Sequence, residues 1–337
     1  MTNSPDKTLL VRRLEQIGSQ LFFIVGCGRS GTTLLQAMLL CNEDIVIPPE
    51  TKFFTGLAGP DWQAGQTIGE RQYHRIAMRV WRDQRRRRVE TDRDRFLALA
   101  QAAPRTWEGL FTALLAAYAD GQGASRVGEK SPVHTHVVGE LMVAYPRAKF
   151  VHIVRDPRAV IMSRMVADFG THMIGPNIQR WRRAIEMHRD YADRLGPDRY
   201  YMLRYEDLVT DPEQPLRAVC DHLGIPFVPD MLQPHKRRRS GVTDPSSSVM
   251  ANTFKPISTS SIDRWRRDMK PAHVAMTEYA LRDEMSLMNY PTTGARTWYP
   301  SIRIAMSMPV GKVEMWWRTI RRALRKIRTV VSRKNHG

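Results

Sequence analysis

The sequence predicts an α/β domain with a central parallel sheet flanked by helices. In the stretch from Leu21 to Leu40, a short apolar run is followed by glycines and then by a helical pattern. The same order returns at Phe150–Val154, where Asp-Pro and a helical pattern follow a buried strand. A further strand begins at Tyr200. Strands that alternate with helices are typical of parallel sheets in three-layer domains.

Composition fits a globular protein with an unusual charge. Of the 337 residues, 42% are hydrophobic and 26% charged, which is ordinary for a soluble domain. The net charge of +18 and the pI near 10.3 favour partners such as phosphates, sulfated polymers, nucleic acid or an anionic membrane surface, without choosing among them. The three cysteines form neither an even framework nor a C-x-x-C pair, so a reducing compartment is expected.

The division of the chain follows from these patterns. We expect a lead-in over residues 1–17, one domain over 18–290 with a helical insertion at about 56–125, and a basic tail over 301–337. Neither a signal peptide nor an uncharged run of about 18 residues is visible, so the sequence predicts no spanning helix. A cytoplasmic location is expected, and the inner face of the membrane is the open alternative.

The glycine turn after the first strand carries the clearest chemistry. Such a turn exposes backbone N–H groups at a helix N-terminus, which favours an anion. Gly26-x4-Gly31 nearly fits the nucleotide-triphosphate loop, but Thr32 replaces the lysine that reaches the β- and γ-phosphates. Arg29 with the hydroxyls of Ser30, Thr32 and Thr33 instead suits one tetrahedral anion held without metal.

Two of these motifs resemble one family. GCGRSGTTLL resembles the 5′-phosphosulfate loop of sulfotransferases that use 3′-phosphoadenosine 5′-phosphosulfate (PAPS), and VRDPRAVIMS resembles their 3′-phosphate motif. Two anion-binding motifs, each at a strand-to-helix junction, are more specific together than either alone. The resemblance implies a P-loop-like fold and PAPS as co-substrate, with no metal. It implies that the 5′ end is bound by Gly28, Arg29, Ser30, Gly31, Thr32 and Thr33, and the 3′-phosphate by Arg155 and Ser163.

Glu50 is the candidate catalytic base. It follows an expected short strand at Ile45–Ile47 and two prolines, so it lies near the sheet edge where ligands of open α/β sheets gather. The E-T-K-F-F run resembles the loop of tyrosylprotein and heparan sulfotransferases in which a glutamate removes the proton of the acceptor hydroxyl. An exposed surface glutamate without such a role is the open alternative.

Lys130 is expected in the loop before a helix that begins near Pro132. The E-K-S-P run resembles the second loop of the same family, whose lysine contacts the bridging oxygen of the leaving phosphate. Negative charge accumulates on that oxygen as the sulfur–oxygen bond breaks, and an ammonium lowers the barrier. His134 and His136 alternate nearby, but no cysteine or carboxylate stands at ligand spacing, so a zinc site is not expected.

Three later residues complete the candidate site. Tyr205 is expected on a strand from Tyr200 to Val209, and it resembles the family's tyrosine beside the adenine, although core packing explains it equally well. Lys255 resembles a lysine of the family's closing segment that contacts the cofactor, but a lysine in a basic loop needs no such role. Ser261 is expected to cap the helix that follows.

Two basic stretches have open interpretations. Residues 79–95 contain eight arginines, which form either a solvated face or a site for an anionic acceptor such as a glycan acid or a lipid headgroup. Helical spacing then covers Phe96 to Ala119. The tail at 301–337 combines basic residues with paired tryptophans at helical spacing, which suits an anionic membrane surface. Packing on the enzyme or on a second subunit remains open for this amphipathic helix, and nucleic acid is not expected.

The hypothesis is transfer of a sulfuryl group from PAPS to a hydroxyl of a carbohydrate, a glycolipid or another acceptor. Glu50, Lys130 and Arg29 are its catalytic residues. One alternative is a P-loop kinase with a degenerate loop, because the turn nearly fits the triphosphate motif. Another is a catalytically silent, membrane-associated nucleotide-binding protein. The sequence does not indicate an oligomeric state.

Overall fold

The computed structural model describes residues 6–59, 61–167, 171–236 and 255–295, and these residues fall in two compact units. Of the described residues, those within 6–155 and 184–262 form the first unit, and those within 156–183 and 263–295 form the second. The expected single domain over 18–290 stays a prediction, and the basic tail at 301–337 lies outside the described residues. None of the helices in the described ranges has the length and apolar character that crossing a bilayer requires.

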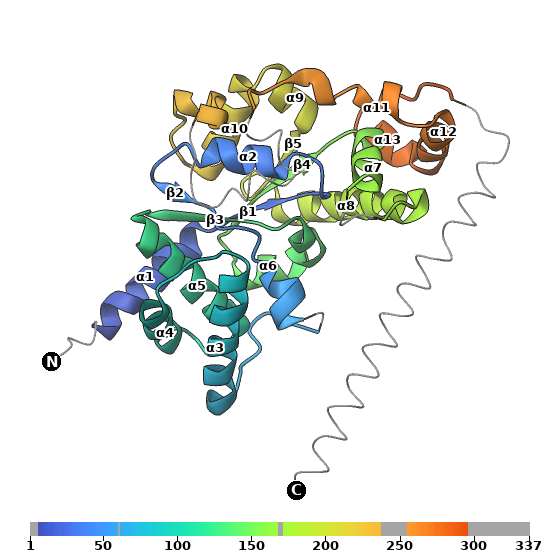
Figure 1. Cartoon of the computed structure of the whole chain (residues 1–337). Helices are drawn as coiled ribbons and strands as arrows, with labels where there is room; N and C mark the ends of the chain where they lie inside the picture. The colour runs from blue at the N-terminus through green and yellow to red at the C-terminus, as the bar shows by residue number, and fades with distance from the viewer. Residues whose placement is uncertain (1–5, 60, 168–170, 237–254, 296–337) are drawn as a thin grey trace, which may run out of the picture. The chain divides into compact units, whose positions relative to one another are not determined.

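The first unit is built on a parallel sheet with the strand order β2-β3-β1-β4-β5 (Figure 1). Its strands are β1 Phe22–Val25, β2 Ile45–Val46, β3 Arg126–Lys130, β4 Lys149–Val154 and β5 Tyr200–Arg204. Phe22 of the central strand pairs with Gly128 on one side and with Lys149 on the other. All neighbouring strands run parallel, so their carboxyl ends lie at one edge of the sheet.

Helices cover both faces of this sheet. Phe23 of β1 belongs to a core formed with α1 Lys7–Gln20, α3 Glu70–Arg86, α4 Arg93–Ala102, α5 Trp107–Gln122 and α6 Val138–Ala144. Phe22 belongs to the opposite core, formed with α2 Thr32–Leu39, α9 Tyr205–Thr210 and α10 Glu213–Leu223. Successive side chains of a strand point to opposite faces, so each strand contributes to both cores. The three-layer α/β prediction is confirmed (Figure 1).

The helical spacing over Phe96–Ala119 belongs to two helices, not one. Helix α4 ends at Ala102 because Pro104 disfavours the helical conformation at Ala103, which is extended. Helix α5 then begins after Thr106, whose hydroxyl accepts the N–H of Gly109. Shorter turns cover Phe53–Ala58, Pro132–Val137, Pro229–Leu232, Pro234–Lys236 and Thr259–Ser261.

The second unit is helical. It contains α7 Pro157–Met165, the beginning of α8 Ile174–Leu195, α11 Arg264–Asp268, α12 Pro271–Ala280 and α13 Arg282–Leu287. Arg158 on α7 is 1% exposed and lies 2.6 Å from a carboxylate oxygen of Asp156 and 2.7 Å from one of Glu278. Its guanidinium carbon lies 3.9 Å from the Trp265 ring centroid. Such a buried charge is tolerated because it is paired on several sides.

Gly128 permits the close pairing of β3 with the central strand. A Cβ at this position would lie 2.2 Å from the Phe22 ring. We therefore expect Gly128→Ala to lower the free energy of unfolding by about 1–3 kcal/mol, as measured by urea denaturation. Gly18 in α1 is the matched control, because a Cβ there meets nothing within 4 Å. Gly18→Ala should raise stability by about 0.5–1 kcal/mol, and equal effects of the two changes would contradict this account.

A buried histidine in β4 makes stability sensitive to acid. Burial and the neighbouring His188 lower the pKa of His152 from 6.5 to about 3. Below pH 6.5 the unfolded chain therefore takes up a proton that the folded chain does not, so unfolding becomes easier as the pH falls toward 3. This residue should contribute a slope of about 1.4 kcal/mol per pH unit.

Urea denaturation between about pH 5 and 6.5 measures that slope. His152→Gln should lower this slope by about 1.4 kcal/mol per pH unit, because the variant lacks the group that binds a proton on unfolding. A wild-type slope in the His152 variant would contradict the assignment.

Candidate active site

Each strand of the sheet delivers one candidate residue at its carboxyl end. Arg29 lies in the turn after β1, Glu50 follows β2, and Lys130 is the last residue of β3. Arg155 follows β4 directly, and Tyr205 follows β5. Ligands of open α/β sheets bind at this edge, where the central strand has neighbours on both sides. The topology thus brings five residues, far apart in sequence, to one edge.

Glycine is required at two positions of the turn after β1. Gly26 has a φ of 143°, and a Cβ there would lie 2.4 Å from the carbonyl oxygen of Ile153. Gly31 has a φ of 101°, and its Cβ would lie 2.4 Å from the Tyr205 ring. Arg29 also has a positive φ, 83°, which a residue with a side chain rarely adopts. Strained backbone of this kind clusters at ligand-binding sites.

The turn presents an anion site at the start of α2. Gly31 precedes the helix and supplies no side-chain cap, so the first N–H groups of α2 are open to an anion. The Ser30 hydroxyl is buried and has no hydrogen-bond partner among the described residues. A buried polar group normally has a partner. Both observations fit a phosphate or sulfate group at this position.

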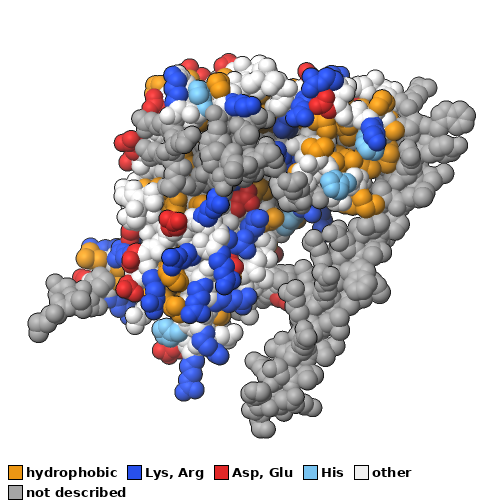
Figure 2. All heavy atoms as spheres, in the orientation of Figure 1, with side chains coloured by type: hydrophobic (Ala, Val, Ile, Leu, Met, Phe, Trp, Pro, Cys, Tyr) orange, Lys and Arg blue, Asp and Glu red, His pale blue; other side chains and the backbone are white. Residues whose placement is uncertain are grey.

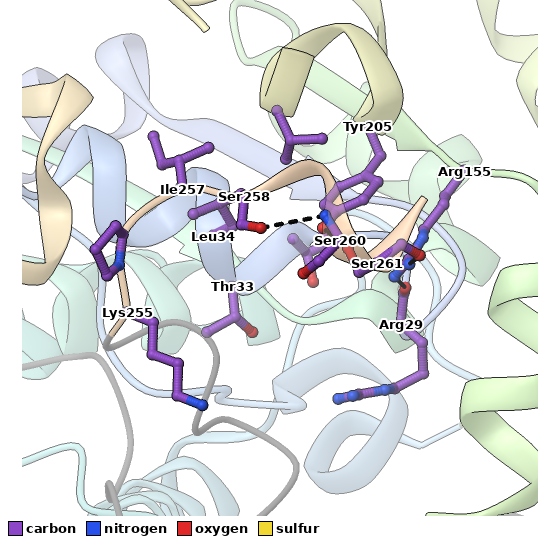
Figure 3. Close-up of a pocket in the computed structure, with 14 residues that line it drawn as sticks. Arg29, Thr33, Leu34, Arg155, Tyr205, Lys255, Ile257, Ser258, Ser260 and Ser261 are labelled. Atoms are coloured by element: carbon purple, nitrogen blue, oxygen red, sulfur yellow. Dashed lines mark hydrogen bonds between the residues drawn. The ribbon is translucent and has the colours of Figure 1, made fainter. Parts of the chain in front are cut away.

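A cavity of about 450 Å³ opens beside this turn, within the first unit. Its lining includes the sequence-predicted Arg29, Gly31, Thr32, Thr33, Arg155, Tyr205 and Lys255, together with the segment from Pro256 to Ser261. Figure 3 shows Arg29 and Lys255 reaching toward one another from opposite sides, with Thr33 between them. Cationic groups therefore face the cavity from two separate segments, as a multiply charged anion requires.

Arg155 and Tyr205 form a connected pair on the side of the cavity where Arg29 lies (Figure 3). The Arg155 guanidinium donates to the carbonyl oxygens of Arg29 at 3.2 Å and Ser261 at 2.6 Å. Its central carbon lies 4.3 Å from the Tyr205 ring centroid. The Tyr205 and Ser261 hydroxyls lie 2.6 Å apart. These contacts join the glycine turn to the segment after Lys255.

Three sequence predictions about these elements are wrong. Tyr205 does not continue a strand but begins α9, because β5 ends at Arg204. Ser261 does not cap a helix, since α11 begins at Arg264 after Asp263, and the Ser261 hydroxyl pairs with Tyr205. Lys130 does not lie in a loop before a helix; it ends β3, because parallel pairing extends as far as Ile24 and Lys130.

Lys130 lies between the candidate base and the glycine turn. Its ammonium nitrogen is 2.8 Å from Glu50 Oε1 and 3.5 Å from the Thr33 hydroxyl. The Lys130 side chain is 2% exposed, whereas that of Glu50 is 27% exposed. The more exposed Lys52 lies 3.7 Å from the other Glu50 oxygen. A buried cation thus bridges a solvent-accessible carboxylate and an anion-binding turn.

A buried carboxylate that the sequence analysis did not identify anchors this arrangement. Glu129 is 1% exposed and accepts hydrogen bonds from the hydroxyls of Thr51 at 2.8 Å and Ser131 at 2.5 Å. Its other oxygen lies 2.8 Å from Nδ1 of His134. Burial alone would raise the pKa of Glu129, but His134 and the two hydroxyls hold that pKa below its ordinary value.

The same network fixes the backbone after Glu50. The N–H of Lys52 donates to the Ser131 hydroxyl at 3.1 Å, and the N–H of Phe54 donates to Nε2 of His134 at 3.3 Å. Since Nε2 accepts, Nδ1 carries the proton and donates to Glu129. Lys52 itself has a φ of 47°. The segment that carries the candidate base is therefore held to the end of β3 by side-chain hydrogen bonds.

Ser163 lies on α7 in the second unit, whereas Arg155 belongs to the first. Their joint role at a 3′-phosphate stays a prediction, as does the place of Tyr205 beside an adenine. Gly28 lies in the turn after β1 but is not part of the cavity lining. Across the ranges that the structure describes, no group of three or more His, Cys, Asp or Glu is placed to hold a metal ion.

Comparison with known proteins identifies the family. Residues 22–230 match the sequence profile of the sulfotransferase family. The chain belongs to this family. The match begins at β1 and extends beyond β5, so it includes Arg29, Glu50, Lys130, Arg155 and Tyr205.

Individual sulfotransferases share about a quarter to a third of their aligned residues with this chain. A protein-tyrosine sulfotransferase of Drosophila melanogaster is 28% identical over 258 residues, which are 73% of this chain and 46% of that protein. An omega-hydroxy-beta-dihydromenaquinone-9 sulfotransferase of Mycobacterium bovis is 32% identical over 148 residues, 39% of this chain and 38% of that protein. The chain thus spans less than half the length of these two relatives.

A solved structure supports the fold. The sulfotransferase domain of the Synechococcus PCC 7002 olefin synthase has a TM-score of 0.58 and is 24% identical, covering 80% of this chain and 95% of that domain. At this identity the likeness concerns the fold alone.

The Glu129 network gives a test of how the Glu50 segment is held. Thr51→Val should remove one donor from a buried carboxylate and lower the free energy of unfolding by about 1–3 kcal/mol. Thr51→Ser keeps the hydroxyl and is the matched control. Urea denaturation of the two variants measures the difference. Equal stabilities would show that the hydroxyl bond to Glu129 contributes nothing measurable.

Proposed function

We propose that this protein transfers a sulfuryl group from PAPS to an acceptor hydroxyl. The observation that carries the proposal is the Glu50–Lys130–Thr33 arrangement at the edge of an anion-binding cavity. It combines a base, a cation and an anion-binding turn at the carboxyl ends of adjacent strands. Membership of the sulfotransferase family supports the reaction class.

The residues around the cavity suit the donor. The N-terminus of α2 and Arg29 would hold the 5′-phosphosulfate, and Lys255 faces the same cavity from the opposite side. Arg155 would bind the 3′-phosphate. When bound, PAPS supplies the sulfuryl group, and PAP is the product that leaves. These assignments need no metal, since fixed cations and backbone dipoles supply the positive charge.

Each catalytic residue has a separate task. Glu50 accepts the proton of the acceptor hydroxyl as its oxygen forms a bond to sulfur. The bond from sulfur to the bridging phosphate oxygen breaks at the same time, and Lys130 stabilises the charge that develops on that oxygen. In the structure Glu50 and Lys130 pair with each other, which orients both groups before either reactant binds. When the acceptor binds, its hydroxyl would donate a hydrogen bond to Glu50 in place of the one from Lys130.

The acceptor is the open part of the proposal. One relative is named for protein tyrosine and another for a menaquinone derivative. A hydroxyl of a carbohydrate, a glycolipid or another acceptor remains compatible with a glutamate base. The proposed interaction of the tail at 301–337 with an anionic membrane would favour an acceptor borne by the membrane. A cytoplasmic enzyme at the inner face of the membrane is consistent with the membrane-binding tail and with an acceptor in the membrane.

A degenerate kinase is the second candidate, because the turn after β1 resembles the triphosphate loop. Thr32 occupies the position of the phosphate-binding lysine and is 4% exposed. Lys130 reaches the turn from β3 instead, but it is paired with a carboxylate. The two candidates differ in which nucleotide binds.

Calorimetric titration with PAP, ADP and ATP, the last with Mg²⁺, distinguishes these candidates. We expect PAP to bind most tightly, because its 3′-phosphate meets Arg155. Arg155→Ala should weaken PAP binding at least tenfold, since a hydrogen bond to a charged group contributes about 1.5–3 kcal/mol. ADP affinity should change little. Tighter binding of ATP with Mg²⁺ than of PAP would replace the sulfotransferase proposal with the kinase.

Glu50→Gln separates chemistry from donor binding. This variant keeps the size of the side chain but cannot accept the proton, so transfer from PAPS should fall by about 10²–10⁴-fold. PAP affinity should remain near that of the wild type. A radiolabelled transfer assay on a panel of hydroxyl acceptors measures the rate. Undiminished transfer would remove Glu50 from the mechanism, and no transfer by the wild type to any acceptor would favour the catalytically silent alternative.

A further inference from the structure

Helix α3 carries a row of arginines along its solvent face. Arg71, Arg75, Arg79, Arg82 and Arg86 follow one another at intervals of three or four residues, and all five are exposed. Residues at this spacing lie on one side of a helix. The opposite side of α3 is buried through Tyr73, Ala77, Val80 and Gln84. The row is about 22 Å long, because a helix rises 1.5 Å per residue. Figure 2 shows Lys and Arg side chains gathered over α3.

Among the described residues, no carboxylate is paired with this arginine row. Within the described part of the chain, none of its five members forms an ion pair. The acidic residues on the same helix are already used, because Asp83 pairs with Arg87 and Glu70 pairs with Arg105. Like charges on successive turns repel each other and destabilise a helix. A bound anion would relieve that repulsion.

The arginine row leads to the segment that carries the candidate base. Gln84, near the C-terminal end of α3, donates from its amide nitrogen to the carbonyl oxygen of Thr51 at 3.1 Å. Thr51 directly follows Glu50 and is fixed by Glu129. The whole arrangement lies within the first unit. A ligand lying along α3 toward Arg86 therefore approaches the segment of the catalytic carboxylate.

The chemistry of the arginine row favours a linear polyanion over a bilayer. Interfacial helices bind a membrane by inserting an apolar face, but the apolar face of α3 is buried in its own core. The large hydrophobic side chains that are exposed in the described ranges, such as Val143 and Tyr279, lie on other elements.

The outer face of α3 offers a polypeptide its charges and nothing else. Peptides are recognised through strand addition to a sheet edge, through apolar side chains that fill pockets, or through acidic residues that pair with arginines, and this row suits the last mode alone. A helix offers no free backbone groups along its length, and the row consists of guanidinium groups alone. Guanidinium groups bind carboxylate and sulfate in a forked geometry. The preferred ligand is a chain whose repeated feature is its anionic groups.

We propose that the arginine row binds a linear acidic polysaccharide with carboxylate or sulfate groups along its length. The bound chain delivers one of its own hydroxyls to Glu50. The inference rests on the proposed function, and it assigns to that reaction an acceptor class and a docking surface. Such a chain provides both the anions that the row needs and the hydroxyl that the reaction needs.

The test compares two triple variants of equal charge. Arg75→Gln/Arg79→Gln/Arg82→Gln removes the middle of the row, and Arg12→Gln/Arg147→Gln/Arg189→Gln removes three exposed arginines on other elements. The probe is polygalacturonate longer than the row, titrated at low and at moderate salt. We expect the row variant to bind about tenfold to a hundredfold more weakly than the wild type. The control variant should lose about twofold or less, because distant charges are screened.

Three further probes distinguish a polysaccharide from an acidic peptide and from a membrane. Polyglutamate, phosphatidylglycerol vesicles and neutral dextran are titrated in parallel with polygalacturonate. Equal losses in the two triple variants would overturn the docking surface. Tighter, row-dependent binding of polyglutamate or of the vesicles would overturn the polysaccharide in favour of an acidic peptide or a membrane.

PAP titration of the same samples separates the two proposals. The row variant should keep the PAP affinity of the wild type, because none of its substitutions lines the donor cavity. If the wild type fails to bind PAP, the proposed function fails while the polysaccharide result can still be read. If PAP binds and polygalacturonate does not, only the docking inference fails.

Discussion

Parallel pairing of β1 with β3 on one side and β4 on the other is the constraint on which the site depends. Because the neighbouring strands also run parallel, every strand ends at the same edge, and each connection begins there. The glycine turn after β1 occupies the centre of that edge. Glu50 and Lys130 come from the strands on one side, and Arg155 and Tyr205 from those on the other. Without the parallel register these residues would not meet.

Two neighbouring buried charges at this edge have separate sets of partners. Glu129 and Lys130 are adjacent in sequence and both buried, and each has its own partners. Glu129 receives hydrogen bonds from Thr51, Ser131 and His134, whereas Lys130 pairs with Glu50. Burying a charge is tolerable only when it is paired in this way. Glu129 and its hydrogen-bond partners hold the backbone in place. The Lys130–Glu50 pair remains accessible for chemistry, because the Glu50 side chain is partly exposed.

Two of the four non-glycine residues that have a positive φ in the described part of the chain lie in the same region. Arg29 and Lys52 both have positive φ values although neither is glycine. Arg29 is itself a catalytic candidate, and Lys52 follows Glu50 by two residues. Hydrogen bonds hold both segments, through the Arg29 carbonyl and the Lys52 N–H. Strain of this kind persists only where the surrounding structure determines the conformation, as it does here.

Local patterns in the sequence were enough to predict the layers of the fold. Apolar runs followed by glycine or Asp-Pro are local patterns, and they identified β1, β4 and the helices after them because strand and helix periodicity is read within one segment. The glycine turn was predicted from such a pattern as well, and its binding of an anion and the role of Glu50 stay predictions. The contacts of each side chain, in contrast, became known from the three-dimensional arrangement of the strands. It showed that Lys130 ends a strand beside Glu50, that Ser261 pairs with Tyr205, and that Glu129 anchors the base segment. These contacts join residues 56 to 80 positions apart, and no local pattern specifies them because they arise from strand order and packing.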